Sequence, residues 1–147
     1  MIQKNIFLLA LAFLFSSLAF SQKNVVTGEK IKAIGPYSPG VQIGNMLYVS
    51  GQIGLHPDST EIVVDSLDEE IIQAMENVKA ILTQAQYNYS DVVSVTIYMT
   101  DLEEYARMNK VYRKYFPDKS YPARTVVEVA RLPRDANFEI SVIAQQK

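Results

Sequence analysis

Two charged residues lie within apolar segments near the C-terminal end of the chain. Arg124 follows Pro122 and Ala123 at the start of one β-rich segment, and Glu139 lies in a second one, residues 138–144. Such charges are costly unless they meet a partner or a ligand. A guanidinium can bind both oxygens of a carboxylate, and a glutamate can orient water and take its proton. The pair indicates either a site for a small carboxylate-bearing molecule or a solvated or ion-paired structural role.

Other catalytic groups are scarce in this sequence. It contains no cysteine, which excludes a thiol nucleophile and a thiolate metal site, and its only histidine is His56. His56 precedes Pro57 and Asp58, a context more typical of a loop than of a catalytic base. Clusters of metal ligands and phosphate-binding glycine loops are also missing from the sequence. We therefore expect neither a metal nor an organic cofactor.

Residues 1–21 have the pattern of a cleavable secretory signal. One basic residue, Lys4, precedes the apolar run 6–15, and small residues follow at Ala19 and Ser21. The run is short for a membrane span, although an uncleaved membrane anchor is the alternative. The pattern predicts an exported protein, periplasmic or secreted, without stable membrane association after cleavage. The mature chain, residues 22–147, is then one domain.

The charge balance bears on the partners to expect. The full chain has 14 Lys and Arg against 16 Asp and Glu, a net charge of −2. Loss of the first 21 residues removes only Lys4, so the net charge becomes −3. A mildly acidic chain offers no electrostatic footprint for phosphate backbones, so nucleic acid is not expected as a partner.

The mature sequence alternates strand and helix patterns. Strands are predicted over 46–50, 92–100, 124–130 and 138–144, and residues 31–33 and 41–43 could pair as edge strands. One helix follows the capping pair Ser66 and Glu69, and a second begins at Asp101 and ends before Pro117. The order predicts an α/β (α+β) domain in which two helices cover one face of a mixed sheet.

The last two strands lead to two further expectations. Val126 and Ile143 would lie on the sheet face without helices, where they would be wet in a monomer, so we expect a homo-oligomer. If the strands form an antiparallel hairpin centred near Arg134, Arg124 pairs near Ala144. Arg124 and Glu139 are then about 17 Å apart at ~3.3 Å per residue. One site would therefore take the two residues from different subunits.

Six short motifs occur in order along the mature chain: Gly35-Pro36-Tyr37-Ser38, Val49-Ser50-Gly51-Gln52-Ile53, Met108-Asn109 with Tyr112 and Phe116, Pro122-Ala123-Arg124-Thr125, Val127-Glu128-Val129-Ala130-Arg131-Leu132-Pro133, and Phe138-Glu139-Ile140. Together they resemble the signatures of the RidA family of reactive-intermediate deaminases. The resemblance covers essentially the whole mature chain.

The resemblance implies a chorismate-mutase-like fold assembled as a homotrimer, with a central barrel and active sites between subunits. It also implies hydrolysis of 2-imino acids, which are enamine/imine intermediates, to 2-keto acids and ammonia without a cofactor. By motif, Arg124 matches the family's carboxylate-binding arginine and Glu139 the carboxylate that handles the attacking water. Tyr37, Ser50 and Asn109 match further substrate-binding residues. A 2-imino acid suits these side chains because it carries one carboxylate for an arginine and one electrophilic carbon for activated water.

Three features depart from the family pattern. Many relatives have a cysteine where this chain has Val126, so thiol regulation is not expected here. Gln86 replaces the usual glycine after the first helix, and Asn88 is expected to take over the role of stopping the helix. Export is the third departure, because relatives typically work in the cytosol or organelles; a cytoplasmic location is thus the alternative.

Two other functions stay open at this point. A non-catalytic binding module could use the same cleft and Arg124 to hold a small carboxylate or keto acid, without needing Glu139. An endoribonuclease is less compatible with the acidic charge and the single histidine. Glu128, which alternates with valines, is a rival to Glu139 for the acid/base role, or a structural partner of Arg124.

Overall fold

The computed structural model describes residues 22–31, 33–59, 61–63, 65–116 and 120–146. The predicted signal, residues 1–21, lies outside this part, so its cleavage stays a prediction. Within the described ranges no helix is both long and apolar enough to cross a membrane.

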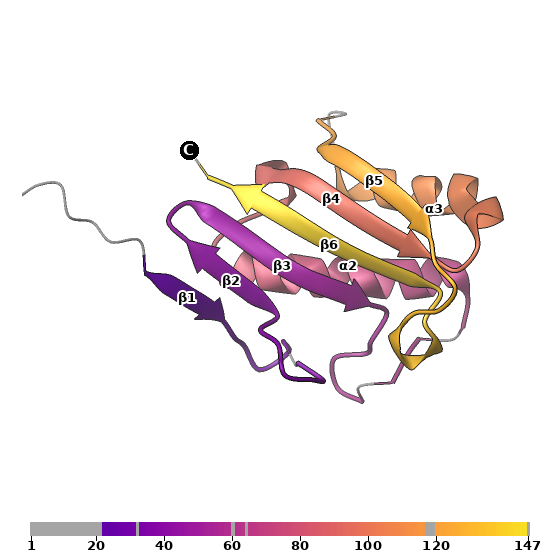
Figure 1. Ribbon diagram of the computed structural model, residues 1–147, viewed down its shortest axis with the longest axis horizontal. Coiled ribbons are helices and arrows are strands. Elements are labelled where there is room, and N and C mark those ends of the chain that lie inside the picture. Colours follow the sequence, from indigo (N-terminus) through magenta and orange to yellow (C-terminus); the bar gives the residue numbers. More distant parts are fainter. Residues whose placement is uncertain (1–21, 32, 60, 64, 117–119, 147) are drawn as a thin grey trace, which may run out of the picture.

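One six-stranded sheet forms the front layer of the molecule (Figure 1). Its strands in chain order are β1 (Lys23–Val26), β2 (Gly40–Ile43), β3 (Met46–Ile53), β4 (Val92–Met99), β5 (Ala123–Glu128) and β6 (Phe138–Gln145). Their order across the sheet is β1-β2-β3-β6-β4-β5. All neighbours are antiparallel except β4 and β5, which are parallel. The sheet is thus mixed, as predicted.

Two helices, α2 (Leu67–Gln84) and α3 (Tyr105–Tyr112), pack behind this sheet (Figure 1). The Ser66 hydroxyl accepts a hydrogen bond from the Glu69 amide at 3.3 Å, and Asp101 Oδ1 accepts one from the Glu103 amide at 2.8 Å. Both predicted helix starts are therefore confirmed, since these side chains satisfy amides that lack a partner in the first turn. Asp101 begins a short 3₁₀ turn that leads into α3.

The main core lies between the sheet and the two helices. It joins residues of β3, β4 and β6, such as Leu47, Ile97 and Ile140, to Met75 of α2 and Met108 of α3, all of them fully buried. The buried residues of both helices face this core. Burial of such side chains stabilises the fold by about 1.5–3 kcal/mol each, and it fixes the sheet as the platform for the charged residues.

The helix α2 ends differently from the prediction. Gln86 has φ 65°, and the amides of Gln86 and Tyr87 donate to the carbonyls of Thr83 and Leu82. This is a Schellman ending with a left-handed residue that is usually glycine. Gln86 itself therefore stops the helix, and Asn88 instead caps the following 3₁₀ turn.

The predicted C-terminal hairpin is wrong. β5 pairs in parallel with β4, and β6 lies between β3 and β4, so the last two strands are not neighbours. The reason is that α3 forms a crossover from β4 to β5, which makes those two strands parallel. The turn after β5 then carries the chain across β4 to the middle of the sheet.

Two smaller expectations also fail. The strand next to residues 40–43 is β1, in which Val25 opposes Val41, whereas Ile31 forms only an isolated bridge with Gly28. Val126 opposes Ile97 of the core and packs on the helix side. The open face instead carries Tyr48 and Ile143, which oppose each other, and an exposed Val127.

Candidate functional site

Arg124 and Glu139 lie on opposite faces of the sheet. Arg124 opposes Val95, whose side chain is in the core, so Arg124 shares the helix side of the sheet. Glu139 opposes Tyr98, three residues further along β4 and therefore on the open face. Three residues and two strand spacings separate their Cα atoms by about 14 Å. One chain cannot bring both groups to one small ligand.

Glu139 is half-buried and has no hydrogen-bond partner among the residues that the structure describes. Loss of solvation raises the pKa of its carboxyl group above the ordinary glutamate value. A carboxylate in this condition is a better proton acceptor than an exposed one. The side chain is therefore suited to act on water or on an imine nitrogen.

A bulge in β3 makes room for this carboxylate. Val49 pairs with Val142 and Gln52 with Ile140, so β3 has one residue more than β6 in this interval. A Cβ atom on Gly51 would lie 1.8 Å from Glu139 Oε1. Gly51 is thus needed for close approach, and the bulge places its backbone beneath the carboxylate.

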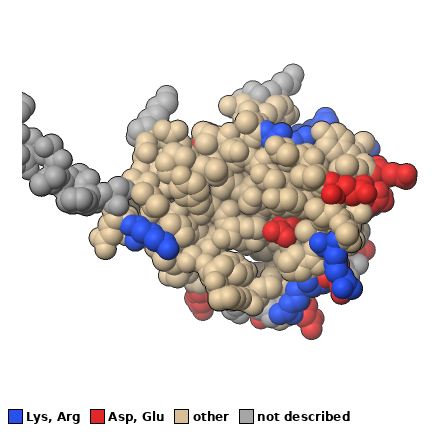
Figure 2. All heavy atoms as spheres, in the orientation of Figure 1, with Lys and Arg blue, Asp and Glu red and all other residues tan. Residues whose placement is uncertain are grey.

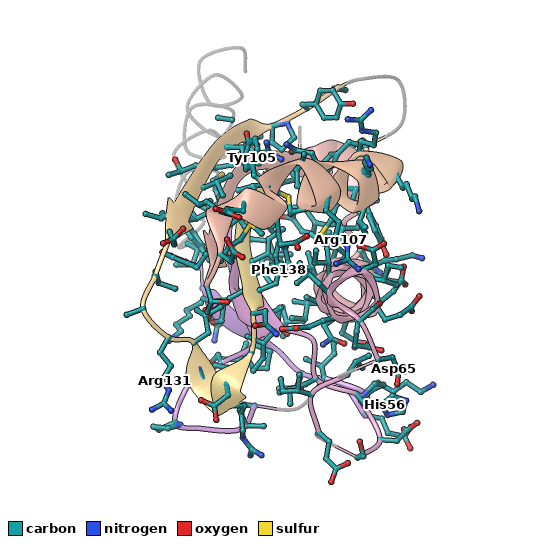
Figure 3. All side chains as sticks on the ribbon, turned by 90° about the vertical axis from the view of Figure 1, so that its right-hand side faces the viewer. His56, Asp65, Tyr105, Arg107, Arg131 and Phe138 are labelled. Carbon is teal, nitrogen blue, oxygen red and sulfur yellow. The ribbon has the colours of Figure 1, made fainter. Side chains whose placement is uncertain are left out.

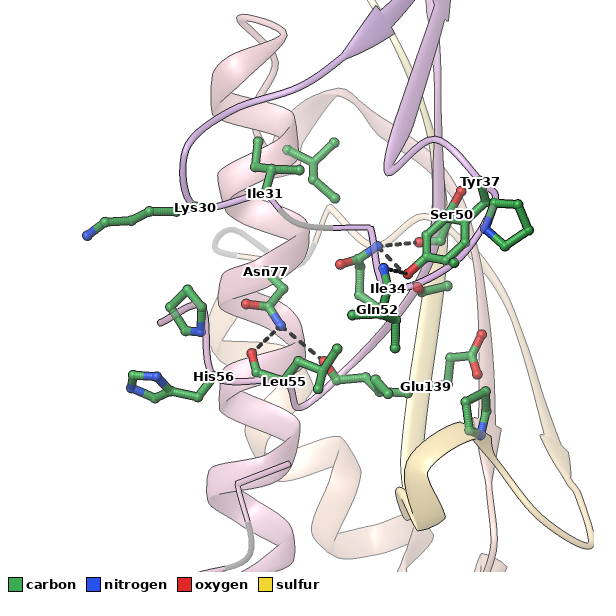
Figure 4. A pocket seen from close by; sticks show the side chains of 17 residues that line it. Lys30, Ile31, Ile34, Tyr37, Ser50, Gln52, Leu55, His56, Asn77 and Glu139 are labelled. Carbon is green, nitrogen blue, oxygen red and sulfur yellow. Dashed lines mark hydrogen bonds between the residues drawn. The ribbon is translucent and has the colours of Figure 1, made fainter. Parts of the chain in front are cut away.

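Glu139 lines a cavity of about 520 Å³ together with Tyr37 and Ser50 (Figure 4). The Ser50 hydroxyl donates to the Ser38 carbonyl at 2.7 Å, which holds the segment before β2 against β3. The Tyr37 hydroxyl accepts a weak bond from the Ile34 amide at 3.4 Å. Three of the predicted site residues therefore share one cavity, and the space-filling view shows the open face hollowed near its middle (Figure 2).

The other predicted residues, Arg124 and Asn109, line a separate cavity of about 440 Å³. The Arg124 guanidinium lies 4.6 Å from the ring centroid of Tyr112 and 5.7 Å from that of Tyr105. Its Nη2 atom also donates to the Tyr105 hydroxyl at 3.1 Å. Aromatic faces hold a guanidinium in place without neutralising it.

Arg124 keeps its charge available for a ligand. Within the described ranges it forms no ion pair, whereas Arg107 and Arg131 contact Asp68 and Asp135 at 2.6 and 3.0 Å. Arg107 reaches from α3 to α2 and ties the two helices together (Figure 3). An arginine fixed by neutral groups is the arrangement expected of an anion site.

Sequence reasoning missed three contributors. Gly51 belongs to the second of the six motifs, but the sequence gives no sign of how close Glu139 comes to it. Tyr105 and Tyr112 were detectable in part, since with Asn109 they follow an i, i+4, i+7 spacing on one helix face. Tyr112 is buried in the core, and its ring also contacts the Arg124 guanidinium. Burial raises the pKa of its hydroxyl to about 12, so this group stays neutral.

Glu128, the rival acid/base candidate, has a structural role. Its Oε2 atom accepts a hydrogen bond from the Leu102 amide at 3.0 Å, at the start of the 3₁₀ turn before α3. It does not pair with Arg124. His56 lies in a loop, as predicted, and its Nδ1 atom accepts a bond from the Asp58 amide at 3.3 Å. Among the described residues no three acidic or histidine side chains converge as metal ligands.

The structure is a two-layer α+β domain in which Arg124 and Glu139 line two separate cavities on opposite faces of the sheet. The chain matches the family described as Endoribonuclease L-PSP over residues 27–146. It is 49% identical over 125 residues to a RutC family protein of Saccharolobus solfataricus, covering 84% of this chain and 98% of that protein.

It is also 41% identical over 125 residues to an Escherichia coli protein named "Putative reactive intermediate deaminase TdcF", covering 84% of this chain and 96% of the relative. Two solved structures are closely similar. The structure of Escherichia coli TdcF with bound serine gives a TM-score of 0.79 at 38% identity, covering 84% of this chain and 99% of that one. RidA from a Psychrobacter bacterium gives 0.79 at 35% identity, with the same coverage. The chain therefore belongs to the RidA/YjgF family, and the predicted fold is confirmed.

Proposed function

We propose that the protein hydrolyses 2-imino acids to 2-keto acids and ammonia at sites formed between subunits of a homotrimer. The observation that carries this proposal is the division of the site. Arg124, which has no acidic partner among the described residues, and the desolvated Glu139 line separate cavities on opposite sheet faces. Each cavity supplies one half of what imine hydrolysis requires.

The Arg124 cavity suits the carboxylate of the substrate. Its guanidinium offers parallel N–H donors, and Asn109 in the same cavity adds an amide. Binding the carboxylate there fixes the direction in which the adjacent imine carbon points. Holding two reactants in the correct orientation removes a large part of the activation free energy of a reaction between them.

Glu139 suits the proton transfers. Water adds to the iminium carbon, so a C–O bond forms, the C=N electron pair moves to nitrogen, and Glu139 takes one proton. Protonated Glu139 then gives this proton to the amine nitrogen. The C–N bond breaks as the C=O bond forms, and ammonia leaves with the remaining hydroxyl proton as ammonium. The raised pKa of Glu139 favours both transfers near neutral pH.

The apolar open face supports assembly. Tyr48 and Val127 are 45% and 40% exposed there, and a second subunit that covered them would bring its own half-site to the first. The homologous relatives support an oligomer only in general terms, so the trimer belongs to the proposal. Sedimentation of the purified protein measures it directly.

A direct test couples the protein to an amino-acid oxidase and follows imine decay. Wild-type protein should accelerate decay over buffer; Glu139→Gln should abolish the acceleration but still bind the 2-keto acid product, whereas Arg124→Ala should lose both. A binding module, the second candidate, rests on the Arg124 cavity alone, and it would replace our proposal if neither wild type nor variants accelerate decay while Arg124-dependent binding persists.

An endoribonuclease is the activity printed in the family description. The net charge of −2 argues against it here. Salt-sensitive RNA cleavage by wild type that Glu139→Gln lacks would favour it over deamination.

Export is a separate proposal. It is supported by the pattern of residues 1–21. The N-terminal sequence of the protein isolated from its own cells tests it: a chain beginning near Gln22 agrees with export, and one that retains Met1 contradicts it.

A further inference from the structure

The cavity that holds Glu139 continues past the edge of β3 to the helix layer. β2 pairs with β3 only as far as Val49, and the Ser50 amide still donates to the Pro39 carbonyl at 3.0 Å, so residues 51–53 leave that edge without a strand partner. The cavity runs through this gap from Glu139 on the open face to Asn77 and Ile81 on α2 (Figure 4). One chain therefore supplies both the base and a deep extension behind it.

The extension is aliphatic. Five branched side chains line the same cavity, and they come from the segment before β2, from β3 and the turn after it, and from α2: Ile31, Ile34, Ile53, Leu55 and Ile81. Ile81 is 1% and Ile53 6% exposed, so this wall is fixed by packing. A wall of this kind binds apolar groups and offers no hydrogen bond that would orient polar ones.

The amide NH₂ groups that reach the cavity already donate to backbone carbonyls. Asn77 Nδ2 donates to the carbonyls of Ile53 and Leu55 at 3.0 and 2.9 Å, and its Oδ1 accepts from Gln73 at 2.9 Å. Gln52 Nε2 donates to the carbonyls of Ser50 and Gly51 at 3.0 and 3.1 Å. These NH₂ groups have no donor left for a polar substrate side chain.

Two polar side chains on the rim, Lys30 and His56, point away from the interior. In Figure 4 the side chains of Lys30 and His56 extend outward, on the side of the cavity away from Glu139. Among the described residues, the wall behind Glu139 is thus mainly hydrocarbon, with Ser50, Gln52 and Asn77 as its polar members.

The volume points in the same direction. A cavity of about 520 Å³ falls within the range of sites for drug-sized ligands, and a three-carbon imino acid would leave most of it unfilled. Unfilled space forfeits dispersion contacts that a larger apolar group would make. A branched or aromatic side chain would replace water in the extension and contact the isoleucine wall.

We propose that this cavity selects 2-imino acids with large apolar side chains, those derived from leucine, isoleucine, methionine or phenylalanine, over those derived from alanine or serine. The inference rests on the proposed deaminase function and names its substrate class. The carboxylate stays with the arginine half-site, the imine carbon lies at Glu139, and the side chain enters the aliphatic extension.

The expected preference follows from burial of carbon. The leucine-derived side chain has three carbons more than the alanine-derived one, and each buried methylene is worth roughly a factor of four in binding. kcat/KM for the leucine-derived imine should therefore exceed that for the alanine-derived imine by about 60-fold when all three carbons are buried. The serine-derived imine should be no better than the alanine-derived one.

The test measures both constants for wild type and for two variants. Ile34→Phe fills the extension from a residue that belongs to neither core cluster, so the leucine-to-alanine ratio should fall at least fivefold. Ile43→Phe makes the same change on the exposed end of β2, outside the cavity, and should keep the wild-type ratio. Thermal unfolding of both variants identifies any that fail to fold.

Calorimetric binding of the product keto acids to wild-type protein adds a readout that needs no turnover. If the leucine-derived keto acid binds more tightly than pyruvate, and Ile34→Phe loses this difference, the inference is supported even when no imine is hydrolysed. Absence of hydrolysis in that case overturns only the deaminase function. Equal constants across the series overturn the inference and leave deamination standing. Absence of both binding and turnover overturns both.

Discussion

Mixing two inactive variants tests whether the site is divided between subunits. Arg124→Ala retains the Glu139 cavity, and Glu139→Gln retains the Arg124 cavity, because the two residues lie on opposite faces of the sheet about 14 Å apart. Each variant alone should form an oligomer with no complete site. An oligomer containing both chains should regain sites at some interfaces.

The magnitude follows from counting interfaces. In a ring, each site takes the glutamate half from one subunit and the arginine half from its neighbour. After random mixing at equal amounts, the first subunit carries Glu139 in half of the cases and the second carries Arg124 in half. About one quarter of the sites are then intact, so the mixture should show about 25% of wild-type kcat per site with an unchanged KM.

The assay uses co-expressed or co-refolded chains, followed by imine decay in the oxidase-coupled reaction. Each variant refolded alone is the negative control, and variants mixed without refolding show the effect of slow subunit exchange. Activity close to zero in a verified mixed oligomer would refute the divided site, since a site within one chain can never be repaired by a neighbour.

Four further predictions test individual contacts. Gly51→Ala places a Cβ 1.8 Å from Glu139 Oε1 and so displaces the carboxylate, and kcat should fall by ~10-fold or more. The thermal midpoint, which checks folding, should change little because the flexible carboxylate can move. An unchanged kcat contradicts the placement of Glu139 over Gly51. Tyr105→Phe removes the hydroxyl that Arg124 contacts at 3.1 Å but keeps the ring, so KM should rise severalfold at nearly constant kcat, and Tyr105→Leu should raise KM further; equal KM values in all three proteins refute the contact. Burial raises the pKa of Glu139, so its favourable contribution to stability is present below the unfolded pKa and lost as pH rises through the folded pKa. In protein diluted until its subunits separate, Glu139→Gln should therefore melt higher than wild type at pH 7, with a difference that shrinks as the pH falls below the usual glutamate range. Calorimetry across pH would reveal the opposite trend if the carboxylate is stabilised. Gln86→Gly relieves a left-handed residue with φ 65° and should raise the unfolding free energy by about 1 kcal/mol in a denaturant titration, whereas a loss of stability would show that the Gln86 side chain matters more than its backbone.

Local signals in the sequence predicted local structure well. The caps at Ser66 and Asp101 and the alternation in 92–100 correspond to helix starts and a strand of the structure. Which strands pair depends on segments that are distant in the sequence, and the predicted pairing of the last two strands was wrong. The short turn 132–137 is typical of a hairpin, yet here Arg134 and Asp135 adopt φ of 60° and 56° and lead the chain across a neighbouring strand.

The candidate site shows the same division. The motifs identified residue types, and three of them, Tyr37, Ser50 and Glu139, share a cavity. From the sequence we also expected Arg124 and Glu139 of one chain to lie too far apart to share a ligand, and this expectation rested on a wrong reason. The assumed hairpin register does not exist, and the separation comes from strand order and from the odd offset between Val95 and Tyr98 that turns the two side chains to opposite faces.

The division of the site has a consequence for the base itself. A guanidinium near a carboxylate lowers the pKa of that carboxyl group, so an empty divided site would make Glu139 a weaker base than it is in the single chain. Under the proposed arrangement the substrate carboxylate neutralises Arg124 when it binds. The influence of the arginine on Glu139 is then reduced, and desolvation by the substrate and the aliphatic wall raises the pKa of Glu139 again. Substrate binding would thus restore the basicity needed to take a proton from water, and the acid limb of kcat should lie at higher pH than that of kcat/KM. Coincident limbs would show that Arg124 does not influence Glu139.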